Sequence, residues 1–344
     1  MQSVSVCASG MVTGVGLNAP ASCAAIRCGL SNFEETRFMD KNGEWITGSY
    51  VPLDQPWCGR AKLVHLVLPA IRECLAAVDG IPTEQIPLFL CVAEKDRPGR
   101  LSGLDDLLLD EVEKELNFNF HEKSAVISQG RVGGVFAIQQ ATTLLYHERL
   151  LYCIVAGVDT FLTAGTLAAM EEKERILTGT NSDGFIPGEA GAAVLLYSGS
   201  DKSNEHLGIR GIGFGKEEAH IDSGEPLRAE GLVQAIKQAS DASGMNVADL
   251  DYRITDVNGE QYGFKEAALA LTRTLKERKE EFDIWLPVDC IGEVGAAIVP
   301  VILGVALAAA QKNYAPGKGV LSHLGNDDGR RAAMFLSFSN ARGA

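Results

Sequence analysis

Eight cysteines carry the most reactive side chains in this 344-residue sequence. No two of them form a Cys-x-x-Cys pair, and several stand in apolar runs, where a thiol is usually buried and inert. The pattern indicates reduced, mostly buried thiols and no disulfide framework. The cysteines are Cys7, Cys23, Cys28, Cys58, Cys74, Cys91, Cys153 and Cys290.

A run of alternating glycines, Gly211-x-Gly213-x-Gly215, is similar to the start of a dinucleotide-binding loop. The next residues are Lys216-Glu217-Glu218 rather than a helix that opens with a third glycine, so we expect no dinucleotide site. The sequence also has no Walker loop, no His-Glu-x-x-His motif and no His and Cys cluster with zinc-ligand spacing. We therefore predict no cofactor and no metal.

The charge of the chain limits its partners. It has 31 basic and 45 acidic residues, for a net charge of -14, and this charge repels nucleic acids and anionic membrane surfaces. The apolar runs 66–77 and 298–310 are shorter than the ~20 residues of a membrane-spanning helix, and the first residues lack the pattern of a secretory signal. We predict a cytoplasmic protein with neither nucleic-acid nor membrane partners.

Apolar runs that suit buried strands alternate with amphipathic runs that suit helices, which predicts an α/β fold with helices covering a mixed sheet. A hydrophobic content of 46% is enough for a large core. The strand-like runs are 87–92, 125–128, 151–156, 192–197, 206–212, 252–257, 282–286, 320–324 and 333–338. The helix-like runs are 61–78, 132–148, 227–243, 265–278 and 295–312.

A polar cluster of turn-forming residues, 199–205, divides the sequence. Each side of it runs through a glycine-punctuated strand, a helix, a strand, a helix introduced by glycines and a closing apolar strand. Gly133-Gly134 introduces that second helix in the first part, as Gly292 and Gly295 do in the second. We interpret the pattern as a duplication, with an N-terminal half at 1–202 and a C-terminal half at 203–344.

Four stretches, in order along nearly the whole chain, resemble the β-ketoacyl synthases. Residues 8–16 are similar to their first strand and its Gly-x-Val-Thr-x-x-Gly turn, and residues 152–159 to their central strand with its glycine-rich end. Residues 183–191 match their Asp-Gly-Phe-x-x-Gly-Glu-Gly-Ala-Gly turn, and Gly295-Ala296-Ala297 the start of a late helix. The sequence thus resembles a β-ketoacyl-acyl-carrier-protein synthase of the thiolase superfamily.

The resemblance implies the thiolase fold, in which two βαβαβαββ halves form a five-layered α-β-α-β-α sandwich. It also implies a dimer, either a homodimer or a heterodimer, with acyl carrier protein or acyl-CoA as a candidate partner. In that family the turn holding Asp183 and Glu189 is structural, so we expect no catalytic role for these two acids.

Synthases of this family hold a catalytic cysteine at the N-terminus of a buried helix, where peptide N–H groups and the helix dipole stabilise the thiolate. Alignment on Ala137-Ile138 places Arg131 at that position, and the chain has no cysteine between Val92 and Tyr152. An arginine cannot accept an acyl group, and its charge opposes the dipole. If the alignment shifts by two or three residues, Gln129 or Ser128 takes the position instead.

The two histidines of the family's catalytic set are also replaced. Asn258 stands at the first His position, and Glu260 stands where the family has the Thr of its His-Gly-Thr motif. Gly292, followed by Glu293, stands at the second His position. Both acids lie on loops that would face Arg131, and a buried arginine needs an anionic partner. We predict an ion pair between Arg131 and either Glu260 or Glu293; the alternative is that Arg131 anchors an anion in the former pocket.

Three further residues complete the candidate site. Cys290 stands beside the loop of the second His and is a candidate displaced nucleophile, although a thiol there is more often packed in a core. Phe185, or a residue near Leu324, would correspond to the phenylalanine that gates the acyl channel in the family. The C-terminal loop, 324–331, carries two acids and two arginines where synthases have small residues that support the oxyanion.

Loss of the catalytic set favours a non-catalytic homologue that acts as a partner subunit, scaffold or adaptor, because removal of a nucleophile alone costs many orders of magnitude in rate. The alternative is an acyl-processing enzyme of the 3-oxoacyl synthase family, an acyltransferase or malonyl decarboxylase, that uses Gln129, Asn258 or Glu260 in a rebuilt site. An ordinary condensing synthase is the interpretation that these residues favour least.

Overall fold

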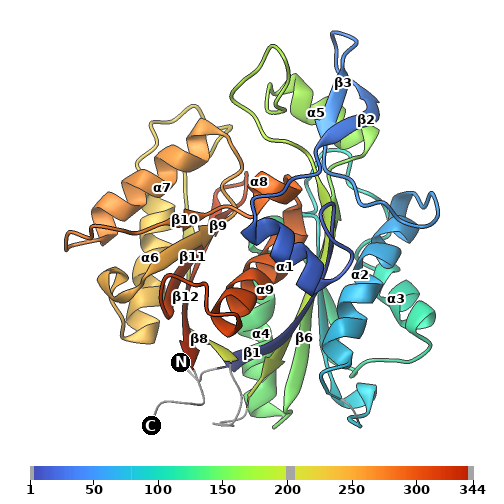
Figure 1. The fold of residues 1–344 in the computed structure, drawn as a ribbon, viewed down its shortest axis with the longest axis vertical. Coiled ribbons are helices and arrows are strands. Elements are labelled where there is room, and N and C mark those ends of the chain that lie inside the picture. The colour runs from blue at the N-terminus through green and yellow to red at the C-terminus, as the bar shows by residue number, and fades with distance from the viewer. Residues whose placement is uncertain (1–3, 79, 199–205, 340–344) are drawn as a thin grey trace.

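The computed structural model describes residues 4–78, 80–198 and 206–339. Ten of its strands form one sheet in the order β10-β9-β11-β12-β8-β1-β7-β6-β4-β5 (Figure 1). The first five strands are β1 (Val4–Thr13), β4 (Leu88–Val92), β5 (Ala125–Ser128), β6 (Tyr152–Thr160) and β7 (Glu189–Tyr197). The second five are β8 (His206–Lys216), β9 (Tyr252–Thr255), β10 (Ile284–Trp285), β11 (Gly319–Gly325) and β12 (Arg330–Ser339).

The two sets of five strands have the same internal order. In each set the first strand along the chain lies at the centre of the whole sheet, the last lies beside it, and the third lies at an outer edge. Val4, Ser5 and Val6 of β1 pair antiparallel with residues 207–209 of β8 and join the two sets at one end. The predicted boundary between residues 202 and 203 lies outside the described residues and stays a prediction.

Helices cover both outer faces of the two sets and fill the space between them (Figure 1). The central layer holds α4 (Gly133–His147) and α9 (Ile298–Gln311), and nearly every side chain of α9 is buried. A helix that is apolar on all sides suits a position between two sheets. The outer layers hold α2 (Gly59–Leu75) and α3 (Leu108–Leu116) on one side, and α6 (Glu230–Ser243) and α7 (Gln261–Thr274) on the other.

These layers give the predicted α-β-α-β-α sandwich. Every strand-like and helix-like run of the sequence overlaps a strand or helix of that type, although some runs extend past it, such as 282–286 around β10 (Ile284–Trp285). Several short elements were not predicted. These are the hairpin β2 (Glu34–Met39) and β3 (Trp45–Gly48), the helices α1 (Ala19–Arg27), α3, α5 (Ala164–Glu172) and α8 (Val288–Ile291), and the 3₁₀ turns 83–85, 130–132 and 247–249. None of the helices in the described ranges is both long and apolar enough to cross a bilayer.

The two central helices approach each other closely at their N-terminal ends. A Cβ atom at Gly134 of α4 would lie 2.4 Å from the Cβ of Val299 in α9, so the contact needs a glycine. The preceding 3₁₀ turns, 130–132 and 295–297, are also in contact. This arrangement brings together the loops that carry Arg131 and Glu293.

Candidate functional site

The residues at the predicted catalytic positions lie together where α4 and α9 begin. Arg131 stands in the turn before α4, Asn258 follows β9, and Glu293 precedes the turn that leads into α9. The Nδ2 atom of Asn258 donates to Oε2 of Glu293 over 2.7 Å, and Nη1 of Arg131 donates to the same oxygen over 3.1 Å. Glu293 thus links the arginine and the asparagine.

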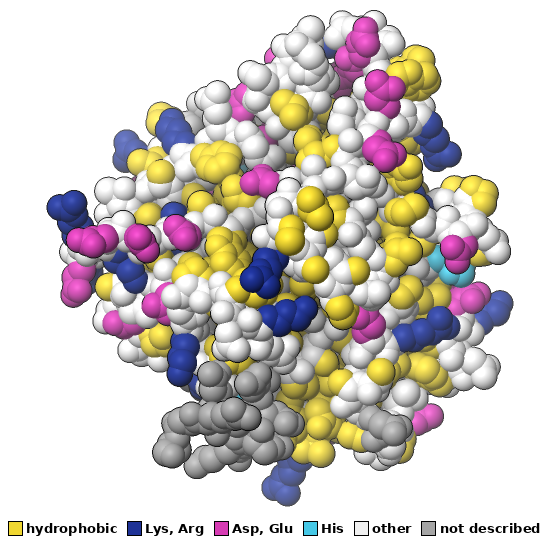
Figure 2. Space-filling view, in the orientation of Figure 1, with side chains coloured by type: hydrophobic (Ala, Val, Ile, Leu, Met, Phe, Trp, Pro, Cys, Tyr) yellow, Lys and Arg dark blue, Asp and Glu magenta, His cyan; other side chains and the backbone are white. Residues whose placement is uncertain are grey.

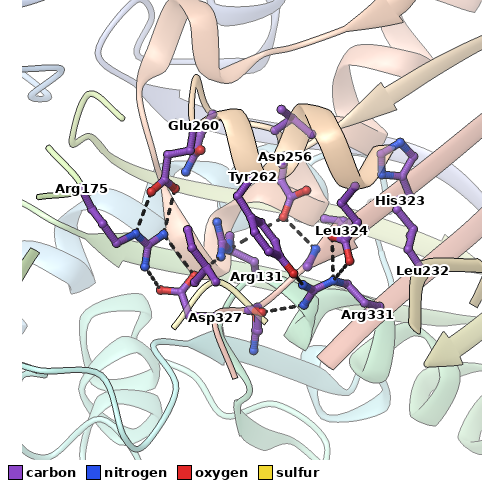
Figure 3. Close-up of a pocket in the computed structure, with 17 residues that line it drawn as sticks. Arg131, Arg175, Leu232, Asp256, Glu260, Tyr262, His323, Leu324, Asp327 and Arg331 are labelled. Carbon is purple, nitrogen blue, oxygen red and sulfur yellow. Dashed lines mark hydrogen bonds and ion pairs between the residues drawn. The ribbon is translucent and has the colours of Figure 1, made fainter. Parts of the chain in front are cut away.

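Arg131 is enclosed by carboxylates (Figure 3). Besides Glu293, its Nη2 lies 2.5 Å from Oδ1 of Asp327, and its Nε lies 3.8 Å from Oδ2 of Asp256. The Arg131 side chain is 15% exposed. Burial opposes its charge, but Glu293, Asp327 and Asp256 together raise the pKa of the guanidinium well above its usual value. The ion pair predicted for Arg131 is therefore found, with Glu293.

Glu260 does not contact Arg131 directly. Its two carboxylate oxygens accept hydrogen bonds of 2.7 and 2.8 Å from Nε and Nη2 of Arg175, a bidentate geometry that favours arginine. The Nη1 atom of Arg175 also lies 2.5 Å from Oδ2 of Asp327. Asp327 therefore bridges Arg131 and Arg175, and one ion network includes both of the acids proposed for Arg131.

Two more buried arginines, each with carboxylates of its own, line the cavities beside Arg131. Nη1 of Arg97 donates to both oxygens of Asp159 at 2.8 Å, and the same guanidinium binds Glu94. Nε of Arg331 donates to Glu266 at 2.8 and 2.9 Å. Each of these two arginines thus has a carboxylate at hydrogen-bonding distance, as a buried cation needs.

The carboxylates of the network differ in acidity. Burial opposes ionisation of Asp327, but Arg131 and Arg175 hold the pKa of its carboxyl well below the usual range. Burial raises the pKa of Asp256 to about 6, because Arg131 and the N–H of Gly325 offset that effect only in part. Asp327 is thus fixed as an anion, whereas Asp256 can take up a proton in mildly acidic solution.

Gly292 brings no functional group to the site, and its backbone excludes one. Its φ of +69° is one that residues with a side chain rarely adopt, and a Cβ atom there would lie 2.8 Å from the carbonyl oxygen of Ile186. The N–H of Glu293 donates to that same carbonyl over 2.8 Å. The chain is therefore held against the turn at 186–188, without room for an imidazole.

The other candidates for or near the nucleophile position, Ser128, Gln129 and Cys290, lie outside the network. The Ser128 hydroxyl binds Asp105 and accepts a 3.2 Å hydrogen bond from Arg100. Gln129 offers its backbone carbonyl to Asn326 Nδ2 at 2.7 Å. Cys290 lies in the hydrophobic core, where burial raises the pKa of its thiol. None of these three residues lines the cavities beside Arg131.

Asp183 and Glu189 of the turn 183–191 hold neighbouring segments in place, as the structural role implied by the resemblance requires. Oδ1 of Asp183 accepts a 2.7 Å hydrogen bond from the N–H of Gln261, which ties the turn to the start of α7. Glu189 is fully buried and accepts from Val51 N–H and Thr160 Oγ1, both at 2.9 Å. The two acids hold different loops and do not form a pair.

Little space is left beside Arg131. One cavity has a volume of about 50 Å³ and is lined by Arg131, Tyr262, His323 and Leu324 among others. A second, of about 10 Å³, is lined by Phe185. These volumes hold a few water molecules, whereas pockets for drug-sized ligands have ~300–1,000 Å³. A surface hollow of about 350 Å³ shares Ile221 and Tyr262 with the 50 Å³ cavity.

Sequence reasoning did not anticipate Arg97, Arg175 or His323. The arginines stand in loops with no motif, and apart from Glu94, which is three residues from Arg97, their acidic partners are 62 to 152 residues away along the chain. His323 is buried on β11, and burial lowers the pKa of its imidazole to about 3, so it is neutral. The described residues contain no group of three or more His, Cys, Asp or Glu side chains that could hold a metal.

Comparison with known proteins places this arrangement in a known fold. No family model matches the sequence, and no curated protein matches it. Among solved structures, a ketosynthase in complex with its chain length factor from Xenorhabdus doucetiae has a TM-score of 0.75 and 14% identity, with 98% of each chain covered. A type II polyketide ketosynthase with its acyl-carrier protein has a TM-score of 0.80 and 14% identity, with 98% of this chain and 99% of that chain covered.

The protein has the thiolase fold of the ketosynthases. A β-ketoacyl synthase from Burkholderia phymatum is equally similar, with a TM-score of 0.75 and 14% identity over 98% of this chain and 99% of that one. The match extends over the full length of such ketosynthase chains, so both halves of the fold are present. In this chain the ion network around Arg131 lies where the two central helices begin.

Proposed function

We propose that this ketosynthase-like protein is a non-catalytic partner subunit, which pairs with an active ketosynthase rather than condensing acyl groups itself. The observation that carries the proposal is Arg131, bound to Glu293 and Asp327, at the position where the resemblance places the nucleophile. Two of the similar structures are pairs of a ketosynthase and a chain length factor, which supports a role in such a pair.

The chemistry of the site supports the loss of condensation. Claisen condensation needs a nucleophile that accepts the acyl chain and hydrogen-bond donors for the developing oxyanion. The side chains around the 50 Å³ cavity include no Cys, Ser or Thr. The guanidinium groups of Arg131 and Arg175 could bind an oxyanion, but carboxylates already occupy them.

The edge of the sheet offers a surface for the partner. β5 ends the ten-stranded sheet and pairs on one side with β4. Its residues Ala125, Val126 and Ser128 are half-buried, and none of them is charged. An uncharged edge strand readily adds a strand from another chain. Because β5 leads directly into the turn of Arg131, a subunit bound there would lie close to the ion network.

Intact-mass measurement tests the loss of catalysis. The protein is incubated with malonyl-loaded acyl carrier protein and, separately, with an acyl-CoA, and both protein mass and released CO₂ are followed. We expect neither a covalent acyl adduct nor decarboxylation above the protein-free rate. A stoichiometric adduct would overturn the proposal.

An acyl-processing role is the second candidate, because the 350 Å³ hollow shares Ile221 and Tyr262 with the inner cavity. Decarboxylation without an adduct in the same assay would favour it, with acyl carrier protein or acyl-CoA as the bound partner. We place either activity in the cytoplasm, since the eight cysteines of the structure are all free.

A further inference from the structure

A cavity of about 610 Å³ lies on the other side of the segment 160–162 from the ion network. Phe161 of this segment lines the 10 Å³ cavity beside Arg131, whereas Thr160 and Leu162 line the larger one. No residue lines both the larger cavity and a cavity beside Arg131. Its volume lies within the range of small-molecule sites, so it is a separate candidate site that does not depend on the proposed function.

The walls of this cavity are rich in aromatic side chains. Phe38 comes from the hairpin β2–β3, and Tyr50 and Trp57 come from the loop that leads into α2. The indole of Trp57 stacks on the ring of His65, with centroids 3.9 Å apart. Two prolines, at 52 and 56, limit the backbone freedom of the loop. The aromatic surface is therefore largely preformed.

A cation lies in the wall of the same cavity. Nζ of Lys62 is 2.6 Å from Oε1 of the fully buried Glu189, which fixes the position of the ammonium. An ammonium has three hydrogen-bond donors, and within the described ranges Glu189 is the one partner found for it. The Lys62 side chain is 23% exposed, so its other donors are available to a ligand. Arg37 adds a second cation to the lining, and Glu35 adds one carboxylate.

We propose that this cavity binds a small aromatic carboxylic acid. Its ring system would lie among Phe38, Tyr50 and Trp57, where offset and edge-to-face contacts between rings are favourable. Its carboxylate would accept a hydrogen bond from Lys62, and a hydrogen bond to a charged group in a partly buried site is among the strong ones. The ligand class follows from this pairing of an aromatic wall with a fixed cation.

Calorimetry with the full chain and two probes of the same shape tests the proposal. We expect naphthalene-2-carboxylate to bind about tenfold more tightly than the neutral naphthalene-2-carboxamide, as the loss of a charged hydrogen bond implies. Lys62→Met should weaken the acid about tenfold and change the affinity for the amide by less than about twofold. Equal affinity of the native protein for acid and amide overturns the proposal, as does decanoate binding as tightly as the naphthoate.

A second pair of variants tests where the acid binds and leaves the ion pair between Lys62 and the buried Glu189 in place. Ala164, the exposed first residue of α5, lines the cavity, and Ala168, also exposed on α5, does not. Ala164→Trp should fill the cavity and weaken naphthoate binding by more than about tenfold, whereas Ala168→Trp should leave it within about twofold. If the two variants bind naphthoate equally, the acid binds elsewhere and the proposal fails.

Discussion

Arg131 occupies the N-terminal end of α4 without the penalty that its charge would have alone. A cation at a helix N-terminus opposes the helix dipole, and burial adds a desolvation cost. Glu293, Asp327 and Asp256 offset both effects, and the pKa of the Arg131 guanidinium is raised rather than lowered. The buried charges therefore balance one another only while Arg131 and these three carboxylates are all present.

Removal of Arg131 should destabilise the fold strongly. In Arg131→Leu, the carboxylates of Glu293 and Asp327 lose a buried partner, and breaking a buried ion pair from one side costs about 3–5 kcal/mol. Urea unfolding at pH 7 measures the change in the free energy of unfolding. As a control, Lys173→Met breaks an exposed pair with Asp222 and should cost less than about 1 kcal/mol. Equal losses in the two variants would contradict a structural role for Arg131.

Asp256 should make stability depend on mild acidity. Its pKa is about 6 in the folded protein, against 3.8 as the ordinary value. Between these values the folded state binds more protons than the unfolded state, so this contribution is present at low pH and is lost as pH rises through 6. The loss amounts to at most about 3 kcal/mol.

Asp256→Asn removes this titration and keeps an acceptor for Gly325 N–H. We expect the free energy of unfolding of the variant, relative to the native protein, to rise as pH increases from 4.5 to 7.5. Urea unfolding at several pH values measures the difference, in which the contributions of other groups cancel. A difference that does not vary with pH, or that falls, would contradict the raised pKa of Asp256.

At the residue level, the sequence predicted one ion pair of the network, between Arg131 and Glu293, but not the ion pairs of Arg175. Arg131 and Glu293 could be anticipated because the resemblance places both on facing loops. The pairing of Glu260 with Arg175 could not be anticipated, because Arg175 is 85 residues away and follows α5, a helix that the sequence did not reveal. Asp327 is one of the two acids that distinguish the C-terminal loop 324–331 in the sequence, but its contact with Arg131 spans 196 residues and could not be predicted.

Among the elements, the closeness of α4 and α9 decides whether the site can form. Gly134→Ala would place a methyl group 2.4 Å from Cβ of Val299, and both atoms belong to packed helices. We expect a loss of about 1–3 kcal/mol in the free energy of unfolding, as for other overpacked cores. Thermal unfolding compares this variant with Gly179→Ala, where an added methyl group would meet nothing within 4 Å. Similar midpoints for the two variants would contradict the close contact.

Elements were predictable where their pattern was strong. Continuous apolar runs such as 151–156 indicated buried strands because such strands have both faces covered. The hairpin β2–β3 has no such run, since four of the six residues of β2 are exposed. The helix α3 is short and ends at Asn117 in the left-handed conformation, a terminus without the usual glycine. Elements of this kind depend on tertiary packing more than on local pattern.

For the whole molecule, the proposed partner surface gives a test of assembly. When the chain is co-expressed with a ketosynthase from the same genome, we expect one copy of each in the complex. Val126→Lys in β5 should abolish the complex because a charge on an edge strand blocks strand pairing. Size-exclusion chromatography with light scattering measures the stoichiometry. Leu151→Lys, at a residue that is 55% exposed and outside β5, serves as control, and equal complex formation by both variants would exclude β5.

The left-handed backbone at Gly292 has a consequence for how this protein can change over evolution. A single substitution of Arg131 by cysteine would restore a thiol but strand Glu293 and Asp327 without their partner. A histidine at 292 would require the segment 186–188 to move first. Each substitution alone would destabilise the fold, so a cysteine at 131 or a histidine at 292 would need compensating changes in the residues around it.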